Sequence, residues 1–267
     1  PISSIEEAVK RIKGLLGAGT NISKAYIYLQ NDVTIDKAIE IPKGLDITIQ
    51  SADFGVSTGG DAGTWSLNAP NINTQTFTIK RASTYKGPLF KLATSNTTNP
   101  SDGNSRLSFL NVNVSGENVA DSSALIEASV GKVTIKQGTT ITGNTAKEGA
   151  SVVDLKGSAV LDLNAKVGEV NITGNNTKEA GAAIVVDENA SAPHPVTLNG
   201  NIKVSGNTVG TGTNPKKANI DIGTKMLWIE KNNEFTGKIN VTTSKTPKAD
   251  NQGTPIVDYE SRTGGAL

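Results

Sequence analysis

The sequence of 267 residues contains no cysteine, which excludes disulfide bonds and metal sites with thiolate ligands. Aromatic residues make up only 4% of the chain, so a hydrophobic core must be built mainly from aliphatic side chains. The single histidine, His194, lies between Pro193 and Pro195, and the flanking prolines predict a rigid, exposed loop. No serine or cysteine stands out as a nucleophile for this histidine, so nothing in the sequence indicates a catalytic triad.

The chain also lacks an excess of charge of either sign. Lysine and arginine together number 26 and aspartate and glutamate 25, a formal net charge of +1, so we expect no binding to nucleic acid. No apolar run approaches the ~18 residues that a membrane span needs, so we expect no membrane insertion. The sequence starts at Pro1 without a methionine, and we interpret it as a fragment of a larger protein.

A short motif of an apolar residue, threonine or serine, and glycine recurs along the second half of the chain. Its copies are Val114-Ser115-Gly116, Ile141-Thr142-Gly143, Ile172-Thr173-Gly174, Val204-Ser205-Gly206 and Phe235-Thr236-Gly237. The glycines are 27, 31, 32 and 31 residues apart, and Asn144, Asn175 and Asn207 follow the three middle copies. A period near 30 is typical of a solenoid, and glycine and asparagine suit sharp corners because they tolerate positive φ.

Each repeat carries three short segments in which apolar and polar residues alternate, the pattern of half-buried strands. Three strands and three corners return the chain to its start, one strand spacing further along an axis. We therefore predict a right-handed parallel β-helix with three strands per coil and regular repeats over 114–238. The alternative, an antiparallel β-sandwich, needs tight turns every 8–12 residues and does not explain corners at this spacing.

The two ends of the chain differ from the repeats. Ile5, Val9, Ile12 and Leu16 fall on one helical face, so residues 1–20 are predicted to form a helix that caps the open end of the coil. Residues 51–76 and 93–106 are predicted to be loop-rich. We assign residues 1–244 to a single β-helix domain and 245–267 to a flexible tail or linker.

Two stretches resemble known families. The run from Ile141 to Ala150, together with Gly181-Ala182-Ala183-Ile184, resembles the repeats of chlamydial polymorphic outer-membrane proteins. The helix followed by residues 27–35 and 39–44 is similar to the pectate-lyase-like adhesive domains of Gram-positive surface proteins, among them the binding regions of serine-rich repeat adhesins. The resemblance implies a β-helix, secreted or on a bacterial cell surface, that mediates attachment to a host or matrix glycan or glycoprotein.

The residues that we expect to contact such a ligand are aromatic or carry a guanidinium group, the types that dominate binding hot spots. Trp65, Arg81, Tyr85 and Arg106 lie in or beside the irregular stretches, and Trp228 occupies an outward position that is polar in earlier repeats. The alternative for Trp65 and Tyr85 is that their rings pack the loops against the coil. For Trp228 it is that the ring packs under the C-terminal segment.

Aligned repeats also place a carboxylate after equivalent apolar residues, at Glu127, Asp154, Asp187 and Asp221. In neighbouring coils these would stack ~5 Å apart, where adjacent like charges are unfavourable. The predicted ladder then either points into solvent or binds a cation such as calcium.

We expect a non-catalytic surface adhesin domain. A polysaccharide lyase or hydrolase of the β-helix class and a structural spacer remain as alternatives, and self-association stays open.

Overall fold

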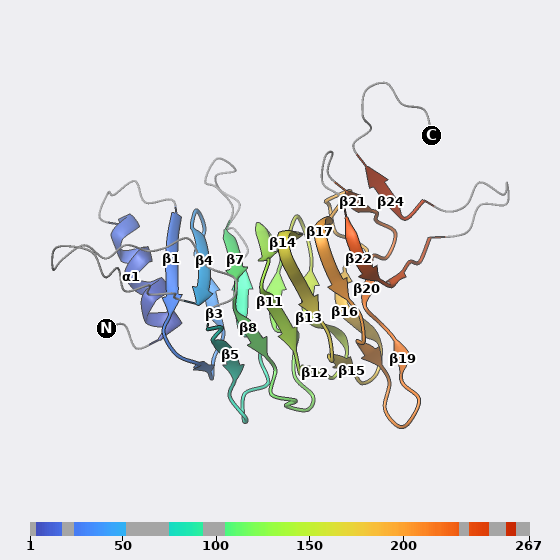
Figure 1. Ribbon diagram of the computed structural model, residues 1–267, viewed down its shortest axis with the longest axis horizontal. Coiled ribbons are helices and arrows are strands. Elements are labelled where there is room, and N and C mark those ends of the chain that lie inside the picture. Colours follow the sequence, from blue (N-terminus) through green and yellow to red (C-terminus); the bar gives the residue numbers. More distant parts are fainter. Residues whose placement is uncertain are drawn as a thin grey trace, which may run out of the picture.

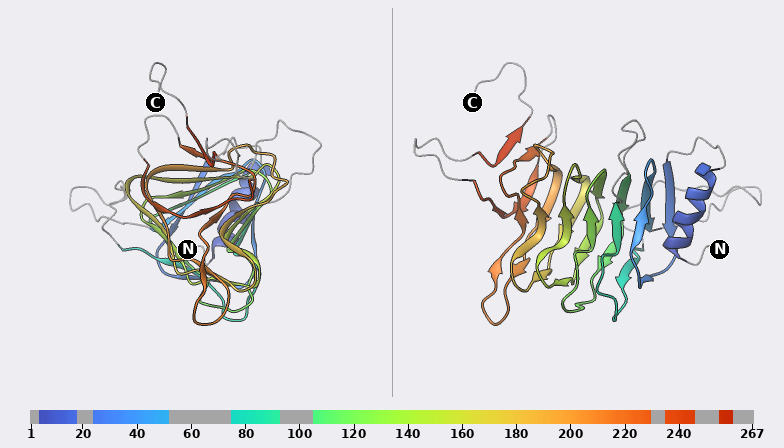
Figure 2. Two further views of the ribbon diagram at one scale, coloured as in Figure 1. Left: turned by 90° about the vertical axis from the view of Figure 1, so that its right-hand side faces the viewer. Right: turned by 180° about the vertical axis from the view of Figure 1, so that it is seen from behind.

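The computed structural model describes residues 4–17, 24–51, 75–92, 105–229, 235–245 and 255–259. The described chain winds into a three-sided coil with the helix α1 (Ile5–Gly17) across one end (Figures 1 and 2). Strands of successive coils lie side by side and pair in parallel. The predicted parallel β-helix with three strands per coil and an N-terminal helix is confirmed.

The strands form three faces that run along the coil axis. The first face contains β1 (Lys24–Leu29), β4 (Asp46–Ser51), β7 (Arg106–Leu110), β10 (Lys132–Lys136), the starts of β14 (Val160–Ile172) and β17 (Val196–Val204), β21 (Leu227–Ile229) and β24 (Val257–Tyr259). The second face contains β2 (Val33–Ile35), β5 (Thr78–Arg81), β8 (Asn113–Ser115), β11 (Thr139–Thr142), the ends of β14 and β17, and β22 (Thr236–Ile239). Because β14 and β17 cross the corner between them, these two faces form one 13-stranded sheet.

The third face is a separate seven-stranded sheet. It contains β3 (Ile39–Ile41), β6 (Phe90–Leu92), β9 (Ile126–Ala128), β13 (Gly149–Leu155), β16 (Gly181–Val186), β20 (Ile220–Asp221) and β23 (Val241–Thr242). A corner sheet contains β12 (Thr145–Ala146), β15 (Asn176–Thr177), β18 (Thr208–Val209) and β19 (Lys216–Lys217). Strand β19 pairs antiparallel with β18, at the base of a projecting loop (Figure 1).

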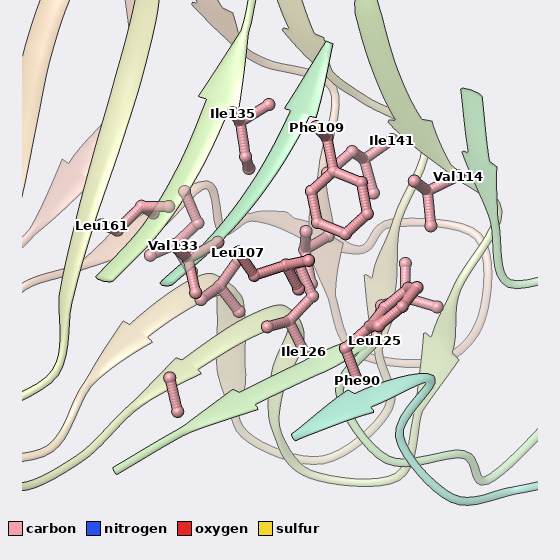
Figure 3. Close-up of a cluster of buried hydrophobic side chains, with 14 of the residues drawn as sticks. Phe90, Leu107, Phe109, Val114, Leu125, Ile126, Val133, Ile135, Ile141 and Leu161 are labelled. Carbon is pink, nitrogen blue, oxygen red and sulfur yellow. The ribbon is translucent and has the colours of Figure 1, made fainter. Parts of the chain in front are cut away.

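The core fills the coil with the inward half of each strand. In β10, Val133 and Ile135 are fully buried, whereas the residues on either side of each point away from the axis. The rings of Phe90 and Phe109 meet edge to face, with centroids 5.2 Å apart, and aliphatic side chains surround them (Figure 3). The low aromatic content therefore corresponds to an aliphatic core, as predicted.

The repeat motifs stack as expected in the middle of the chain and shift at its end. Ile141 pairs with Ile172, and Ile172 pairs with Val204, in adjacent coils. The last predicted copy is wrong, because Ile239 rather than Phe235 lies in register with Val204. The motif therefore identifies the corner in four coils but not in the fifth.

Asparagines that follow the corner glycines form a buried ladder along the axis. The corner glycines carry the positive φ, whereas the asparagines Asn144, Asn175 and Asn207 are at most 1% exposed. The Oδ1 atom of Asn175 accepts a hydrogen bond from the backbone N–H of Asn144 (3.1 Å), and Asn207 and Asn219 repeat this arrangement (both 3.1 Å). Asn219 in turn donates to Oδ1 of Asn240 (3.1 Å). The asparagines thus link successive coils rather than relieve strain within a corner.

The helix α1 covers the N-terminal end of the coil, and an added strand extends its other end. The hydroxyl of Ser4 caps α1 by accepting a hydrogen bond from the backbone N–H of Glu7 (3.1 Å), and Ile5, Ala8 and Val9 are buried against the first coil. At the other end β24 pairs with β21, so the first face extends beyond the predicted boundary at residue 244.

Within the described residues, no helix has the length and apolar character to cross a membrane.

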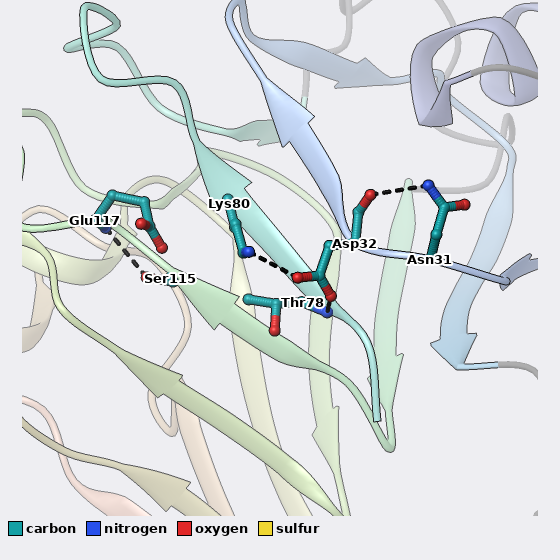
Figure 4. A network of polar contacts seen from close by, with 6 residues as sticks. All are labelled: Asn31, Asp32, Thr78, Lys80, Ser115 and Glu117. Carbon is teal, nitrogen blue, oxygen red and sulfur yellow. Dashed lines mark hydrogen bonds and ion pairs between the residues drawn. The ribbon is translucent and has the colours of Figure 1, made fainter. Parts of the chain in front are cut away.

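An exposed ion pair ties the second face of the first two coils together. Asp32 accepts a hydrogen bond from the backbone N–H of Thr78 (2.9 Å), and its other carboxylate oxygen lies 2.6 Å from Nζ of Lys80 (Figure 4). The hydrogen bond from Lys80 is the main reason that the pKa of Asp32 lies below its ordinary value. This contact supports the first coil, where the helix cap meets the sheet.

Candidate binding groove

The register of the first face aligns its outward side chains in rows along the axis. The central row, read from the first coil to the last strand, consists of Tyr26, Thr48, Ser108, Thr134, Asp162, Thr197, Trp228 and Asp258. One flanking row consists of Lys24, Asp46, Arg106 and Lys132. The other flank includes Lys136, Asn164 and Asn199.

The difference in length between these rows hollows the first face. Thr48, Ser108 and Thr134 are short and at most 8% exposed although they point outward, because longer side chains stand on both sides. The resulting groove has a volume of about 240 Å³ and crosses β1, β4, β7, β10 and β14. We name it the first-face groove and define it by its lining residues: Lys24, Ala25, Tyr26, Asp46, Thr48, Arg106, Ser108, Lys132, Thr134, Lys136, Asp162 and Asn164.

The charges of the groove centre on one buried carboxylate. Asp162 is 7% exposed, and its Oδ2 atom lies 3.0 Å from Nζ of Lys132 on the neighbouring strand. Its Oδ1 atom is buried and has no hydrogen-bond partner within the described part of the chain. At the opposite end of the groove, Tyr26 is 57% exposed and stacks against Tyr28, with centroids 6.3 Å apart.

Arg106 is the predicted ligand residue that lies in this groove. It was expected in a loop-rich stretch, but it begins β7 and is exposed in the row beside the floor. Trp65, also predicted to contact a ligand, lies outside the described residues. Of the ligand contacts predicted in or beside the irregular stretches, Arg106 lines the groove.

Arg81 and Tyr85 instead form a structural cluster. The Arg81 guanidinium is 1% exposed and donates to the carbonyl oxygens of Gly87 and Ser123 and to Oδ1 of Asn144 (3.2 Å), at the start of the asparagine ladder. Burial lowers the pKa of Arg81 to about 10, so the group stays charged at neutral pH. Tyr85 covers it, with the guanidinium carbon 5.8 Å from the ring centroid. Our interpretation of Arg81 as a surface contact is corrected, because the side chain is buried and its terminal nitrogens donate to the protein itself.

Trp228 lies at the far end of the central row, as the aligned repeats predict. It is next to Thr197 in the register, and β24 places Asp258 on its other side. Its ring packs against His194 (centroids 4.8 Å apart), and Nε2 of His194 lies 3.0 Å from Oδ2 of Asp258. His194 is therefore half-buried and partnered, and not the exposed loop histidine that we expected. Trp228 therefore occupies an outward position and borders the C-terminal strand, and its contact with a ligand stays a prediction.

The predicted acidic ladder is wrong in its register. Glu127 and Asp154 are paired neighbours on the third face, but Val185 occupies the next position, between Asp154 and Asp221. Strand β16 continues through Val186 before its acidic residue, so Asp187 lies outside the row.

The four carboxylates of the predicted ladder also have partners. Lys156 lies 2.8 Å from Asp154, and Lys91 lies 3.6 Å from Glu127. Asp187 and Asp221 each accept a hydrogen bond from a backbone N–H two residues further along (2.8 and 3.0 Å). Among the residues described, no group of three or more histidine, aspartate or glutamate side chains is placed to hold a metal ion. The predicted calcium ligands are thus used within the third face.

Comparison of the chain with protein-family models, with curated proteins and with solved structures found no match. The geometry of the faces therefore carries the interpretation of the binding site. Two hollows that flank α1, of about 520 and 810 Å³, are larger than the groove but are lined by the cap and the strands beneath it.

The sequence shows part of the groove as a pattern of outward polar residues, which we used only to single out Trp228. The segment from Lys132 to Lys136 alternates lysine, valine, threonine, isoleucine and lysine, so its polar residues share one face. The register of consecutive first-face strands places Asp162 beside Thr134, within reach of Lys132 on the same strand. We singled out aromatic, arginine and acidic residues as ligand contacts and assigned no role to the short hydroxyl side chains beside them, such as Ser108 and Thr134.

Proposed function

We propose that this protein is a non-catalytic binding domain of a bacterial cell-surface protein, and that its ligand is a glycan strand in the first-face groove. The observation that carries the proposal is the recessed row of Thr48, Ser108, Thr134 and Asp162, with longer polar side chains along both sides. Parallel strands repeat these groups every ~4.8 Å, roughly the rise of one sugar unit in an extended polysaccharide. Each sugar would therefore meet an equivalent set of hydroxyl, amide or charged groups.

The aromatic residues support a glycan rather than an apolar ligand. Tyr26 is exposed at one end of the central row, and an aromatic ring can stack on the apolar face of a sugar. The floor between Tyr26 and Trp228 is polar, which suits hydroxyl-rich molecules and would leave an apolar ligand without matching surface. The attachment role and the bacterial surface location follow from the resemblances of the repeats and of the N-terminal strands.

A groove-filling variant tests the proposal. Thr134→Trp places a bulky ring on the groove floor, and we expect it to reduce binding to glycans selected on a glycan array by at least ~10-fold. Thr140→Trp, at a partly exposed position of the second face, is the matched control and should bind as the unmodified chain does. Unchanged binding by Thr134→Trp would move the site elsewhere. Shortening of a bound polysaccharide during incubation would identify an enzyme instead.

A further inference from the structure

The floor of the first-face groove contains a polar atom that the protein itself does not satisfy. Oδ1 of Asp162 is buried and has no hydrogen-bond donor among the residues that the structure describes, while Oδ2 is paired with Lys132. A buried carboxylate oxygen without a donor is unfavourable, and such groups are uncommon in folded proteins. The unsatisfied acceptor destabilises the free protein. A ligand that donates a hydrogen bond to it removes this penalty and therefore binds more tightly.

The charged side chains that line the groove are mainly cationic. The basic residues of the groove are Lys24, Arg106, Lys132 and Lys136, and its acidic residues are Asp46 and Asp162. Within the described chain, Lys132 forms an ion pair with Asp162, whereas Arg106 and Lys136 form none. The protein as a whole has a net charge of +1, so this local excess is a property of the groove and not of the surface in general.

Resting on the proposed function, we infer that the groove selects an anionic glycan, whose sugars carry carboxylate or sulfate groups beside free hydroxyls. A sugar hydroxyl donates a hydrogen bond to Oδ1 of Asp162, and acid groups of the strand lie against Arg106 and Lys136. Lys132 holds the carboxylate in place from the adjacent strand. The ligand must therefore provide both donors and negative charge, which neither a neutral glycan nor a plain polyanion does.

An acidic peptide fits these observations less well. Extended peptides bound along a strand gain specificity from pockets that accept alternate side chains. The groove floor is instead a row of short polar residues, among them Ser108 and Thr134, without such pockets along its length. A polyanion without hydroxyl groups is therefore a probe that separates simple charge attraction from sugar recognition.

The probes are two matched pairs of polymers and one polypeptide, measured by calorimetric titration of the full chain. Polygalacturonate is compared with its fully methyl-esterified form, dextran sulfate with dextran, and poly-glutamate supplies charge without hydroxyls. We expect one anionic polysaccharide to bind at least ~10-fold more tightly than its neutral partner and than poly-glutamate, with an affinity that falls as salt rises. The pair that responds distinguishes carboxylate from sulfate.

Two variants then separate the roles of the groove residues. Lys136→Gln should weaken binding several-fold, whereas Lys203→Gln, the same change at an exposed lysine on the second face, should not. Asp162→Asn should also weaken binding, because a single uncharged amide oxygen replaces the carboxylate and the ion pair that holds it against Lys132 is lost. If the cations alone attracted the ligand, removing this negative charge would strengthen binding instead. Equal melting temperatures of the variants and the unmodified chain show that folding is retained.

Several outcomes overturn the inference. Stronger binding by Asp162→Asn, or binding of poly-glutamate as tight as that of the polysaccharides, removes the sugar hydroxyl from the recognition. Equal affinity for charged and neutral polymers, abolished by Thr134→Trp, leaves the proposed glycan groove standing and refutes its preference for anions. Absence of binding to every glycan refutes both.

Discussion

At the level of single residues, the buried asparagines show how a repeat motif becomes a structural link. Asn175 donates through Nδ2 to Oδ1 of Asn207 (2.9 Å) and to the carbonyl oxygens of Ile141 and Thr173 (both 3.1 Å). It also accepts from the backbone of Asn144. One side chain therefore satisfies polar groups of three consecutive coils, which explains why this residue type recurs at the corner.

Removing one asparagine from the ladder should destabilise the coil strongly. Asn175→Ala leaves buried polar groups without partners, so we expect the free energy of unfolding to fall by about 2–4 kcal/mol. Asn189→Ala, at an exposed turn position, is the control and should change it by less than ~0.5 kcal/mol. Urea denaturation measures both. A small effect of Asn175→Ala would mean that water replaces the missing amide.

Arg81 starts the same ladder and should affect stability rather than binding. Arg81→Met keeps an extended side chain but removes the donors to Gly87, Ser123 and Asn144. We expect a loss of about 2–4 kcal/mol in the free energy of unfolding, with unchanged affinity for groove ligands at temperatures where the variant is folded. A stable Arg81→Met variant with weakened binding would restore Arg81 as a ligand contact.

At the level of the strands, the close approach of β13 and β16 depends on two paired glycines, of which only one lies against the neighbouring backbone. Gly149 and Gly181 pair with each other in β13 and β16, and both have positive φ (73° and 134°). A Cβ atom on Gly181 would lie 1.8 Å from the carbonyl oxygen of Gly149, whereas a Cβ on Gly149 has no neighbour within 4 Å. Strain in the backbone affects both positions, but a steric clash affects Gly181 alone.

This contrast gives a matched pair of variants. Gly149→Ala should cost about 1 kcal/mol, the strain of positive φ alone. Gly181→Ala should cost clearly more, because the strands must separate to admit the methyl group. Thermal denaturation of both variants measures the difference. Equal effects would show that the two coils yield easily at this corner.

The ion pair between β2 and β5 makes one contribution to stability depend on pH. The folded-state pKa of Asp32 is lowered, so its contribution is fully present above the ordinary value of 3.8 and is lost as pH falls through the folded-state pKa. Asp32→Asn can still accept the hydrogen bond from Thr78 but cannot pair with Lys80. The melting temperatures of the variant and the unmodified chain should therefore differ at neutral pH and converge in acid. A difference that persists in acid would assign it to the backbone hydrogen bond instead.

The sequence predicts strands better than the alignment between them. The alternation of Val133 and Ile135 with polar residues is local, and the inward direction follows from hydrophobicity alone. The position of Asp187 instead depends on how far β16 continues relative to β13, and the register shift between Ala150 and Val153 is a property of two coils together. Repeats of unequal length therefore preserve the fold class while misplacing individual side chains.

At the level of the whole molecule, the proposed binding groove is formed by side chains from several successive coils. No single repeat contains the groove, because its floor takes one short residue from each of several strands, such as Ser108, Thr134 and Asp162. The burial of Arg81 has the same origin, since its partner Asn144 belongs to a coil two turns away. Residue type alone therefore predicts both Arg81 and Arg106 as ligand contacts. Contacts between coils bury Arg81 and leave Arg106 exposed.

The coil should also open from its ends. Each coil packs only on its neighbours, as in other solenoids, so the outermost coils have one neighbour and the central ones two. We expect amide hydrogen exchange to be slowest in β10, β13, β14 and β16 and fastest in the described strands at either end, β1–β3 and β21–β24. Mass spectrometry of peptic fragments resolves these regions.

Two leucine truncations test whether this gradient reflects coil-by-coil stability. Leu163 in the central strand β14 is fully buried, and Leu29 in the first coil is 4% exposed, so each change to alanine leaves a cavity that costs about 2–5 kcal/mol. Leu163→Ala should speed exchange in β14 and in the paired strands β10 and β17, because their packing is shared. Leu29→Ala should speed exchange mainly in the first coil, since that coil can open without its successors. If Leu29→Ala instead accelerates exchange equally along the axis, the coils unfold as one cooperative unit, and the groove would then be lost as a whole rather than from its N-terminal edge.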